Sequence, residues 1–359
     1  MPVECGWLSV ASNHSTGCGK SENRLMNIPP PVFHPPFNIT RASHVVMTVK
    51  DLAASRNFYT ELVGLIVSDE DDNTVYLRGL EEACHHSMVL NRAVDAPRCE
   101  RIGMRVFTEQ DLDKAEAFYR SAGLPTRWAV VPFQGRTLQV TDPLGVPLEF
   151  CATMPVMPRM VTAFRQFKGG CAHRLDHYQI LVPDVQAQCE FYMKQGFRLS
   201  EYIVADRSED FAGVFLQRKG NPHDIVFFSG AGPRLHHFAF TSIDAATLMR
   251  ACDVAGNLGF GQVVERGPGR HGPGHAQFVY IRDPDGHRVE LFTTHYQIMD
   301  IECEPIRWDA ASSLRKEIWG LPPQRSWVEE ASEFAGLAVA APKLAETPMT
   351  LERFLASRG

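Results

Sequence analysis

Two histidines and one glutamate in the second half of the chain have the right chemistry to bind a divalent metal ion. His177 lies in "RLDHYQ", His237 in "GPRLHHFAF" and Glu290 in "RDPDGHRVELF". Two imidazoles and one carboxylate leave coordination positions open, a combination that suits Fe(II) or Mn(II) and reactions of oxygen. A cation would also remove the cost of an ionised carboxylate within an apolar strand. We therefore predict that these three residues are metal ligands.

Glu290 also has a purely structural interpretation. The Asp-Pro-Asp-Gly sequence before it is a turn signal, and the alternating residues that follow predict a β-strand. In such a strand the carboxylate would form an ion pair with Arg282 or Arg288. The metal hypothesis is favoured because His177 and His237 occupy corresponding positions of a repeat.

That repeat also predicts the elements that hold these residues. "HVVMTVKDLAASRNFYTELVGL" begins at His44, and "HYQILVPDVQAQCEFYMKQGF" begins at His177. In both copies an Asp follows the His by 7 residues, and a Phe-Tyr pair follows it by 14 and 15. Each copy predicts a strand, a turn that starts an amphipathic helix, and a glycine stop.

Weaker copies start near Ile102 and His237, and the two pairs of copies end in a "DPLG" and a "DPDG" strand. The sequence therefore predicts an α+β fold of four modules, each a strand, a helix and several strands. The modules would pair into domains at 41–153 and 172–297. Residues 1–40, polar and then rich in proline, predict an irregular arm. Residues 298–359 hold three of the five tryptophans and predict a tail that packs on the second domain.

The first predicted domain lacks a complete set of ligands. His44 and Glu149 hold the places of His177 and Glu290. The second module offers only Ile102 or Gly103 where a second imidazole would be needed. Glu149 is therefore predicted to be a structural remnant.

Composition indicates a globular protein and argues against nucleic-acid binding and a membrane span. The chain has 359 residues, of which 44% are hydrophobic and 22% charged, as in globular proteins. A net charge of −6 without a basic run argues against a nucleic-acid surface. There is no apolar window of the roughly 18 residues that a membrane helix needs, and no signal peptide, so we expect a cytoplasmic protein. The nine cysteines contain no C-x-x-C pair and predict reduced thiols.

A family resemblance adds to this reading. "RLDHYQ", "GPRLHHFAF", "ERGPGRHG", "YIRDPDGHRVELF" and the Phe-Tyr helices resemble type I extradiol ring-cleaving dioxygenases of the vicinal oxygen chelate superfamily. The nearest likeness is to the homoprotocatechuate 2,3-dioxygenase branch, over residues 40–330. The resemblance implies four βαβββ modules in two vicinal-oxygen-chelate domains, and Fe(II), or Mn(II) in some members, on the three predicted ligands. It also implies a homo-oligomer, a tetramer in that branch.

The resemblance assigns further roles near the metal. His223, in "NPHDIVF", would be the acid–base residue, and His271 and Tyr280 would hydrogen-bond the substrate or oxygen. From the residues alone, His223 is equally a turn histidine, His271 a residue of a glycine-rich loop and Tyr280 a core residue. Because adjacent strand residues face opposite sides, only one of His236 and His237 can be a ligand, and the family motif favours His237.

Substrate contacts are where the chain departs from that branch. Gln179 stands in place of Asn, Phe215 in place of a pocket Trp, and Lys316 in place of an arginine of the tail. Arg266 would face the ring substituent together with Lys316, which keeps the charge but loses the two-pronged geometry. Two cations predict a carboxylated catechol, with 3,4-dihydroxyphenylacetate as the first candidate.

The predicted activity is therefore extradiol, or meta, cleavage of a catechol. Both atoms of O2 would enter a ring that opens beside its two hydroxyls, giving a muconic semialdehyde. One alternative is a glyoxalase-like isomerase or transferase, but such sites draw ligands from two half-sites, and the missing imidazole counts against it. Another is a small-molecule-binding protein without chemistry, which has no need for a complete triad and His223.

Overall fold

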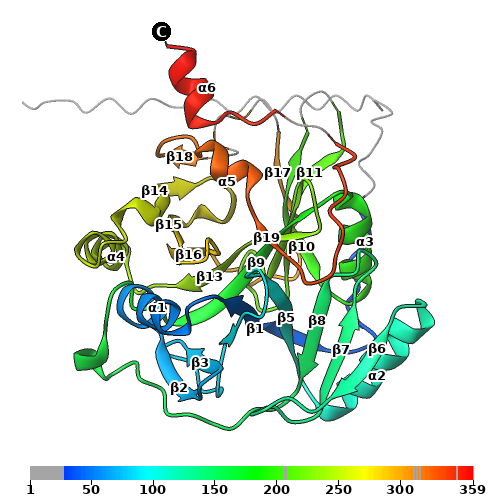
Figure 1. The fold of residues 1–359 in the computed structure, drawn as a ribbon. Coiled ribbons are helices and arrows are strands. Elements are labelled where there is room, and N and C mark those ends of the chain that lie inside the picture. The colour runs from blue at the N-terminus through cyan, green and yellow to red at the C-terminus, as the bar shows by residue number, and fades with distance from the viewer. Residues whose placement is uncertain are drawn as a thin grey trace, which may run out of the picture.

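The computed structural model describes residues 28–205, 208–309, 312, 314, 317–344 and 347–358. These residues form one sheet of eight strands and one of eleven, with few helices (Figure 1). The predicted α+β class is therefore confirmed. Residues 28–38 contain no helix or strand, but the first strand starts at Ile39, within the predicted arm.

Two modules of the same order build the first sheet. The first runs β1 (Ile39–Val49), α1 (Leu52–Asn57), the π-helix η1 (Phe58–Val63), β2 (Ile66–Glu70), β3 (Thr74–Arg78) and β4 (Met88–Arg92). The second runs β5 (Cys99–Val106), α2 (Glu109–Ser121), β6 (Thr126–Ala129), β7 (Thr137–Thr141) and β8 (Pro147–Cys151). The strand order is β2-β3-β4-β1-β5-β8-β7-β6, so the first strands of the two modules pair at the centre.

The second sheet repeats this plan after a connection that contains the 3₁₀ turn η2 (Phe164–Gln166). The third module runs β9 (Arg174–Val182), α3 (Val185–Lys194), β10 (Arg198–Val204), β11 (Phe211–Gln217) and β12 (Ile225–Ser229). The fourth runs β13 (Arg234–Thr241), α4 (Ala245–Asn257), η3 (Gly261–Val263), β14 (Val264–His271), η4 (Pro273–His275), β15 (Gln277–Arg282) and β16 (Arg288–Thr293). Again β9 and β13 pair at the centre.

Repeated sequence positions have repeated structural causes. The Asp that follows the repeat's His by seven residues is a helix N-cap: Asp51 accepts from the Ala54 N–H and Asp184 from the Ala187 N–H. The glycine stop Gly64 has a φ of 87°, a left-handed conformation that an L side chain rarely adopts.

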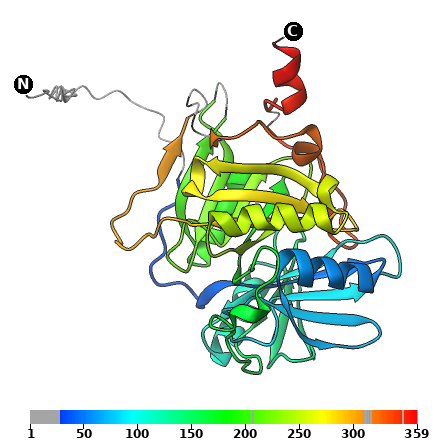
Figure 2. The same ribbon diagram turned by 90° about the vertical axis from the view of Figure 1, so that its left-hand side faces the viewer.

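The Phe-Tyr pairs join the two sheets. Tyr59 donates to Asp283 over 3.0 Å, and Tyr192 donates to Asp142 over 3.3 Å. Each tyrosine thus reaches from a helix beside one sheet to the Asp-Pro turn of the other. The sheets pack against each other in this way, one above the other in Figure 2.

Tail residues extend the second sheet at both ends. β17 (Ile306–Trp308) pairs with β10, and β18 (Glu317–Trp319) pairs with β14, while β19 (Ser332–Glu333) pairs with β13. The short helix α5 (Arg325–Glu329) packs near β13, and α6 (Leu351–Ala356) stands away from the body (Figure 1). Of the three tail tryptophans that were expected to pack, Trp319 is instead 46% exposed.

Membrane-spanning helices are absent from the described part of the chain, because no helix there is both long enough and apolar enough.

Candidate metal centre

The two histidines and the glutamate lie on three neighbouring strands, β9, β13 and β16. Ala239 in the middle strand pairs with His177 on one side and with Glu290 on the other. His237 lies two residues before Ala239, so its side chain leaves the same face of the sheet. All three polar side chains are buried, and Glu290 Oε2 lies 3.1 Å from His177 Nε2 and 3.2 Å from His237 Nε2.

A chain of hydrogen bonds fixes the proton of His237. The Trp327 carbonyl can only accept, so His236 donates to it from Nε2 over 2.8 Å. Burial lowers the pKa of His236 well below its usual value, so the ring is neutral and its Nδ1 accepts. His237 therefore donates from Nδ1 to that atom over 2.7 Å, and its Nε2 lone pair faces Glu290. The structure thus brings His237, and not His236, to the carboxylate.

The same arrangement occurs at His177. Its Nδ1 lies 3.0 Å from Asp176 Oδ2 and donates to it, which leaves the Nε2 lone pair toward Glu290. Metal-binding histidines almost always give their second N–H to a carboxylate or a carbonyl in this way.

The donor atoms fit a divalent ion. Two ligands at a right angle, each about 2.1–2.2 Å from one ion, lie about 3.0–3.1 Å apart. The distances of 3.1 and 3.2 Å from Glu290 Oε2 to the two imidazoles are close to that value. A cation is also the partner that two nitrogen lone pairs and one carboxylate oxygen share without repulsion. His177, His237 and Glu290 therefore form a cluster that can hold a metal ion.

Electrostatics at Glu290 favour its ionised form. Burial raises the pKa of Glu290, but its close contacts with the imidazoles of His177, His237 and His271 lower it by more, so the net pKa is well below its usual range. The carboxyl group is therefore ionised at neutral pH, as a ligand must be.

Arg282 and Arg288 pair with an acid other than Glu290. Arg282 Nη2 lies 2.8 Å from Glu265 Oε1, and Arg288 Nε lies 2.6 Å from Glu265 Oε2. Both guanidinium groups thus pair with another acid on β14. The structural alternative for Glu290, an ion pair with one of these two arginines, is wrong.

His223 lies two residues before β12 and is buried beside the cluster. Its ring centre is 4.2 Å from that of His177 and 4.7 Å from that of His295. The preceding loop is held by Asp224, which accepts from the backbone N–H of Arg218 over 2.6 Å. Burial lowers the pKa of His223 well below its usual value, so the imidazole is neutral. The alternative of an exposed turn histidine does not hold.

His271 and Tyr280 approach the same carboxylate from β14 and β15. His271 Nε2 lies 2.9 Å from Tyr280 Oη and 3.4 Å from Glu290 Oε1. Tyr280 is also directly opposite Glu290 in the register of β15 and β16. Burial, and then the charge of Glu290, raises the pKa of Tyr280 well above its usual value, so its hydroxyl keeps its proton.

Gln179 and Phe215 lie where the sequence placed them, beside the cluster. Gln179 is opposite His237 in the register of β9 and β13. The ring centre of Phe215, on β11, is 5.3 Å from that of His223. Both side chains line a cavity next to the cluster.

Arg266 is engaged by the tail. Its Nη2 forms an ion pair with Glu317 of β18, and its guanidinium carbon lies 4.0 Å from the ring centre of Trp327. Burial lowers the pKa of Arg266 to about 10, which leaves the group charged at neutral pH. Lys316, the second predicted cation, lies outside the described residues.

Two side chains of the site, His295 and Trp327, belong to no motif that predicts them. The His295 ring stacks on Phe292 at 4.3 Å, and with His177 and His223 it forms a second grouping of possible metal ligands. Its place two residues past β16, close behind Glu290, is the signal that could have indicated it. No local pattern around Trp327 signals its contact with the site.

The corresponding place in the first sheet is filled by protein groups. His44 Nε2 lies 2.9 Å from Glu149 Oε1, and Gln134 and Gln139 donate to the same carboxylate over 2.8 and 2.7 Å. Burial raises the pKa of Glu149, but the hydrogen bonds and charge of His44, with the two glutamines, lower it to about 2. This carboxylate has its partners without a metal.

The sheet register corrects one sequence assignment. Gly103 stands in the first sheet where Ala239 stands in the second. Arg101 precedes Gly103 by two residues, as His237 precedes Ala239, so Arg101 holds the place of the second imidazole. The prediction of Ile102 or Gly103 for this place is wrong. A cation stands there instead, and its Nε lies 3.9 Å from the carboxylate of this sheet.

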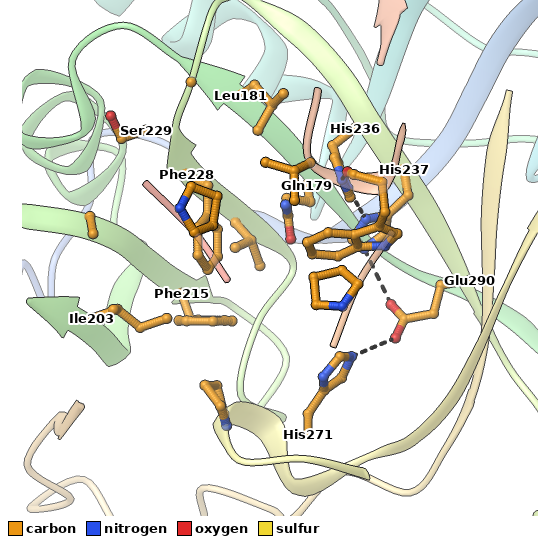
Figure 3. Close-up of a pocket in the computed structure, with 18 of the residues that line it drawn as sticks. Gln179, Leu181, Ile203, Phe215, Phe228, Ser229, His236, His237, His271 and Glu290 are labelled. Carbon is orange, nitrogen blue, oxygen red and sulfur yellow. Dashed lines mark hydrogen bonds and ion pairs between the residues drawn. The ribbon is translucent and has the colours of Figure 1, made fainter. Parts of the chain in front are cut away.

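A cavity of about 380 Å³ opens from the cluster. In Figure 3, Glu290 and His237 lie on one side of it, and Ile203, Phe215 and Phe228 lie on the other. The cluster of His177, His237 and Glu290 therefore faces a space that a small molecule can occupy.

Family comparison agrees with this architecture. Residues 41–150 and 174–291 match the model of the Glyoxalase/Bleomycin resistance protein/Dioxygenase superfamily. The two matches cover more than half of the chain, which therefore belongs to this superfamily.

Similar proteins are ring-cleaving dioxygenases. The chain is 28% identical to a manganese-dependent 2,3-dihydroxybiphenyl 1,2-dioxygenase of Geobacillus genomosp. 3, over 80% of this chain and 95% of that one. It is 26% identical to a metapyrocatechase of Geobacillus stearothermophilus, over 77% of this chain and 87% of that one.

Among solved structures, homoprotocatechuate 2,3-dioxygenase of Brevibacterium fuscum in complex with 3,4-dihydroxyphenylacetate superposes with a TM-score of 0.81. It is 37% identical, over 87% of this chain and 98% of that one. The resemblance to extradiol dioxygenases of the vicinal oxygen chelate superfamily, and to this branch, is confirmed.

Proposed function

We propose that the protein is an extradiol catechol dioxygenase, which inserts both atoms of O2 into a catechol and opens the ring beside the hydroxyls. The observation that carries this proposal is the buried His177, His237 and Glu290 cluster at the end of a cavity. The names of the relatives, several of them ring-cleaving dioxygenases, support it.

In this proposal Fe(II) or Mn(II) is held by His177, His237 and Glu290. When bound, the ion supplies Lewis acidity and open coordination positions at which catechol and O2 can meet. The protein groups on Nδ1 of the two histidines hold each Nε2 toward the ion. The buried carboxylate reduces the net charge that the site must carry.

Protons are handled by the protein in this reaction. His223 is neutral and buried beside the cluster, so its imidazole can take a proton from a catechol hydroxyl and return it later. The Tyr280 hydroxyl keeps its proton and, with His271, presents hydrogen-bond donors at the same end of the cavity. Gln179 and Phe215 would bound the space for the ring.

Three further expectations complete the proposal. The chain would divide at 41–153 and 172–297, with the metal in the second domain and the tail at 298–359 packed over it; the family match at 41–150 and 174–291 supports this division. The protein would form a homo-oligomer, which light scattering after gel filtration tests. We expect it to act in the cytoplasm. Fractionation of the source cells, followed by detection of the protein in each fraction, tests this expectation.

Oxygen consumption tests the proposed reaction. Protein purified under argon is loaded with Fe(II) or Mn(II) and given catechols together with ¹⁸O2. We expect one O2 consumed for each catechol and both labelled atoms in a yellow semialdehyde. A dicarboxylic acid from cleavage between the hydroxyls, or no consumption of O2 with any catechol, would contradict the proposal.

A further inference from the structure

The cavity next to the metal cluster has two chemically different ends. Polar side chains of the cluster, with His223, His271 and Tyr280, form one end. The other is apolar: Ile203, Phe215 and Val226 belong to one buried cluster, against which Phe228 and Leu344 pack. Figure 3 shows Ile203, Phe215 and Phe228 on the side away from Glu290.

The cavity as a whole has room for more than a catechol ring. The cavity volume of about 380 Å³ lies within the range of about 300–1,000 Å³ that holds drug-sized ligands. Tail residues also line the cavity, among them Pro342, Leu344 and Met349, and Leu344 packs against the apolar cluster. A ring bound at the metal would therefore place its substituent among apolar groups.

Arg266 and Glu317 form an ion pair in the described part of the cavity wall. Arg266 is the one arginine or lysine among the described residues that line the cavity, and Glu317 is paired with it. The pair has no net charge, and a substrate carboxylate near Arg266 would also meet the carboxylate of Glu317. Such a carboxylate would lose its hydration and meet no unpaired cation among the described residues that line the cavity, which is costly.

Arg266 still has donors for a neutral partner. Within the described residues, its Nε and Nη1 are buried and make no hydrogen bond. An ether or carbonyl oxygen of the substrate can accept from these atoms without bringing a further charge into the cavity.

We propose that the catechol taken by this site carries an uncharged, mainly apolar ring substituent, which can include a neutral oxygen acceptor. This inference rests on the proposed dioxygenase function and replaces the carboxylated catechol that the sequence predicted. Glu317 is the residue that sets the preference, because it cancels the charge of Arg266.

Binding measured without oxygen tests the substrate class. Metal-loaded protein under argon is titrated by calorimetry with 3,4-dihydroxyphenylacetate, with its methyl ester and with 4-butylcatechol. The acid and its ester differ in charge and little in shape. We expect the ester and the alkylcatechol to bind at least about tenfold more tightly than the acid, a difference of about 1.4 kcal/mol. Equal or tighter binding of the acid would overturn the proposal.

Glu317→Gln tests the cause of the preference. This change keeps the shape of the side chain and removes the charge that neutralises Arg266. The ratio of the two dissociation constants, acid over ester, should fall by at least about tenfold. Glu304→Gln, at an exposed tail position, should leave the ratio unchanged. An unchanged ratio in Glu317→Gln would overturn the role of the ion pair.

The two proposals can fail separately. If no catechol is cleaved in oxygen, the proposed function is wrong, whatever the order of binding. If catechols are cleaved and the acid is the preferred ligand, the proposed function stands and this inference alone is wrong.

Discussion

At the scale of single residues, the metal site depends on which ring nitrogen of each histidine holds the proton. Asp176 accepts a hydrogen bond from the Nδ1–H of His177, and His236 accepts one from the Nδ1–H of His237. Both Nε2 atoms are thereby left as lone-pair donors toward Glu290. The neighbouring residues therefore select the ligand atoms before any metal binds.

Removing any one of the three donors should remove the metal. We expect that His177→Ala, His237→Ala and Glu290→Ala each lose bound Fe(II) or Mn(II) and all ring-cleaving activity. Glu149→Ala should keep both, because its carboxylate is satisfied by His44 and two glutamines in the other sheet. The measurements are the metal content of each variant after desalting and its rate of catechol cleavage. Metal retained at a full equivalent in Glu290→Ala would contradict the ligand assignment.

His223 should affect the rate and not the metal. His223→Phe removes the imidazole that lies 4.2 Å from the His177 ring and keeps a flat ring in its place. We expect normal metal content and a turnover slower by about 10²-fold or more, the usual size of a general acid–base contribution. His34→Phe, at an exposed position of the arm, is the control. Turnover at the parental rate would mean that His223 has a structural role only.

At the scale of elements, the tail completes the site that the strands begin. Helix α5 brings the Trp327 carbonyl to His236 on β13, and β18 brings Glu317 to Arg266 on β14. The tail thus sets the tautomer of His237, a proposed metal ligand, and pairs the charge of Arg266 in the cavity wall. Segments with little secondary structure of their own determine both properties.

Loss of His236 should therefore weaken metal binding without removing it. In His236→Phe, His237 loses the acceptor that holds its proton on Nδ1. We expect metal affinity to fall by about 10- to 100-fold, the usual effect of losing such a partner. Competition with a metal chelator measures the affinity, and the melting temperature of the metal-free protein shows whether the fold is intact. If His236→Phe binds the metal as tightly as His34→Phe does, the hydrogen bond from His237 to His236 does not matter for metal binding.

Sequence patterns predicted the elements with strong local signals. The repeat of His, Asp and Phe-Tyr predicted the modules, because the Asp is an N-cap and the tyrosine bonds the opposite sheet. Arg101 was missed as the counterpart of His237, because register is set by strand pairing and not by spacing. The tail strands β17 and β18 have three residues each, too few for a periodic pattern. The contacts of Glu317 depend on β18 and those of Trp327 on the five-residue helix α5, so neither could be predicted.

At the scale of the whole molecule, the two sheets are joined by a reciprocal exchange. Tyr59 of the first module bonds the turn before β16, and Tyr192 of the third module bonds the turn before β8. A third tyrosine, Tyr178 on β9, donates to the backbone oxygens of His44 and Gly103 over 2.7 and 2.8 Å. The strand that carries His177 is therefore anchored on the sheet that has no complete metal site. The first sheet thus helps to hold in place the strand on which His177 lies.

Each reciprocal bond should contribute to stability and not to metal binding. Tyr59→Phe and Tyr192→Phe each delete one hydroxyl and leave a buried aspartate without one donor, Asp283 or Asp142. We expect each change to lower the free energy of unfolding by about 1–3 kcal/mol, the cost of a buried polar group that loses its partner. Metal content should stay normal, since neither tyrosine lies in the cluster.

Denaturant unfolding of the metal-free variants measures this effect, with Tyr202→Phe as the matched control. The Tyr202 hydroxyl makes no hydrogen bond within the described residues, so its removal leaves no partner unsatisfied and should cost well below about 1 kcal/mol. If the Tyr59 and Tyr192 variants unfold at the same denaturant concentration as Tyr202→Phe, the exchange does not join the sheets. A larger loss in both, together with normal metal content in samples of the same variants loaded separately, would show that these two bonds join the sheets into one cooperative unit.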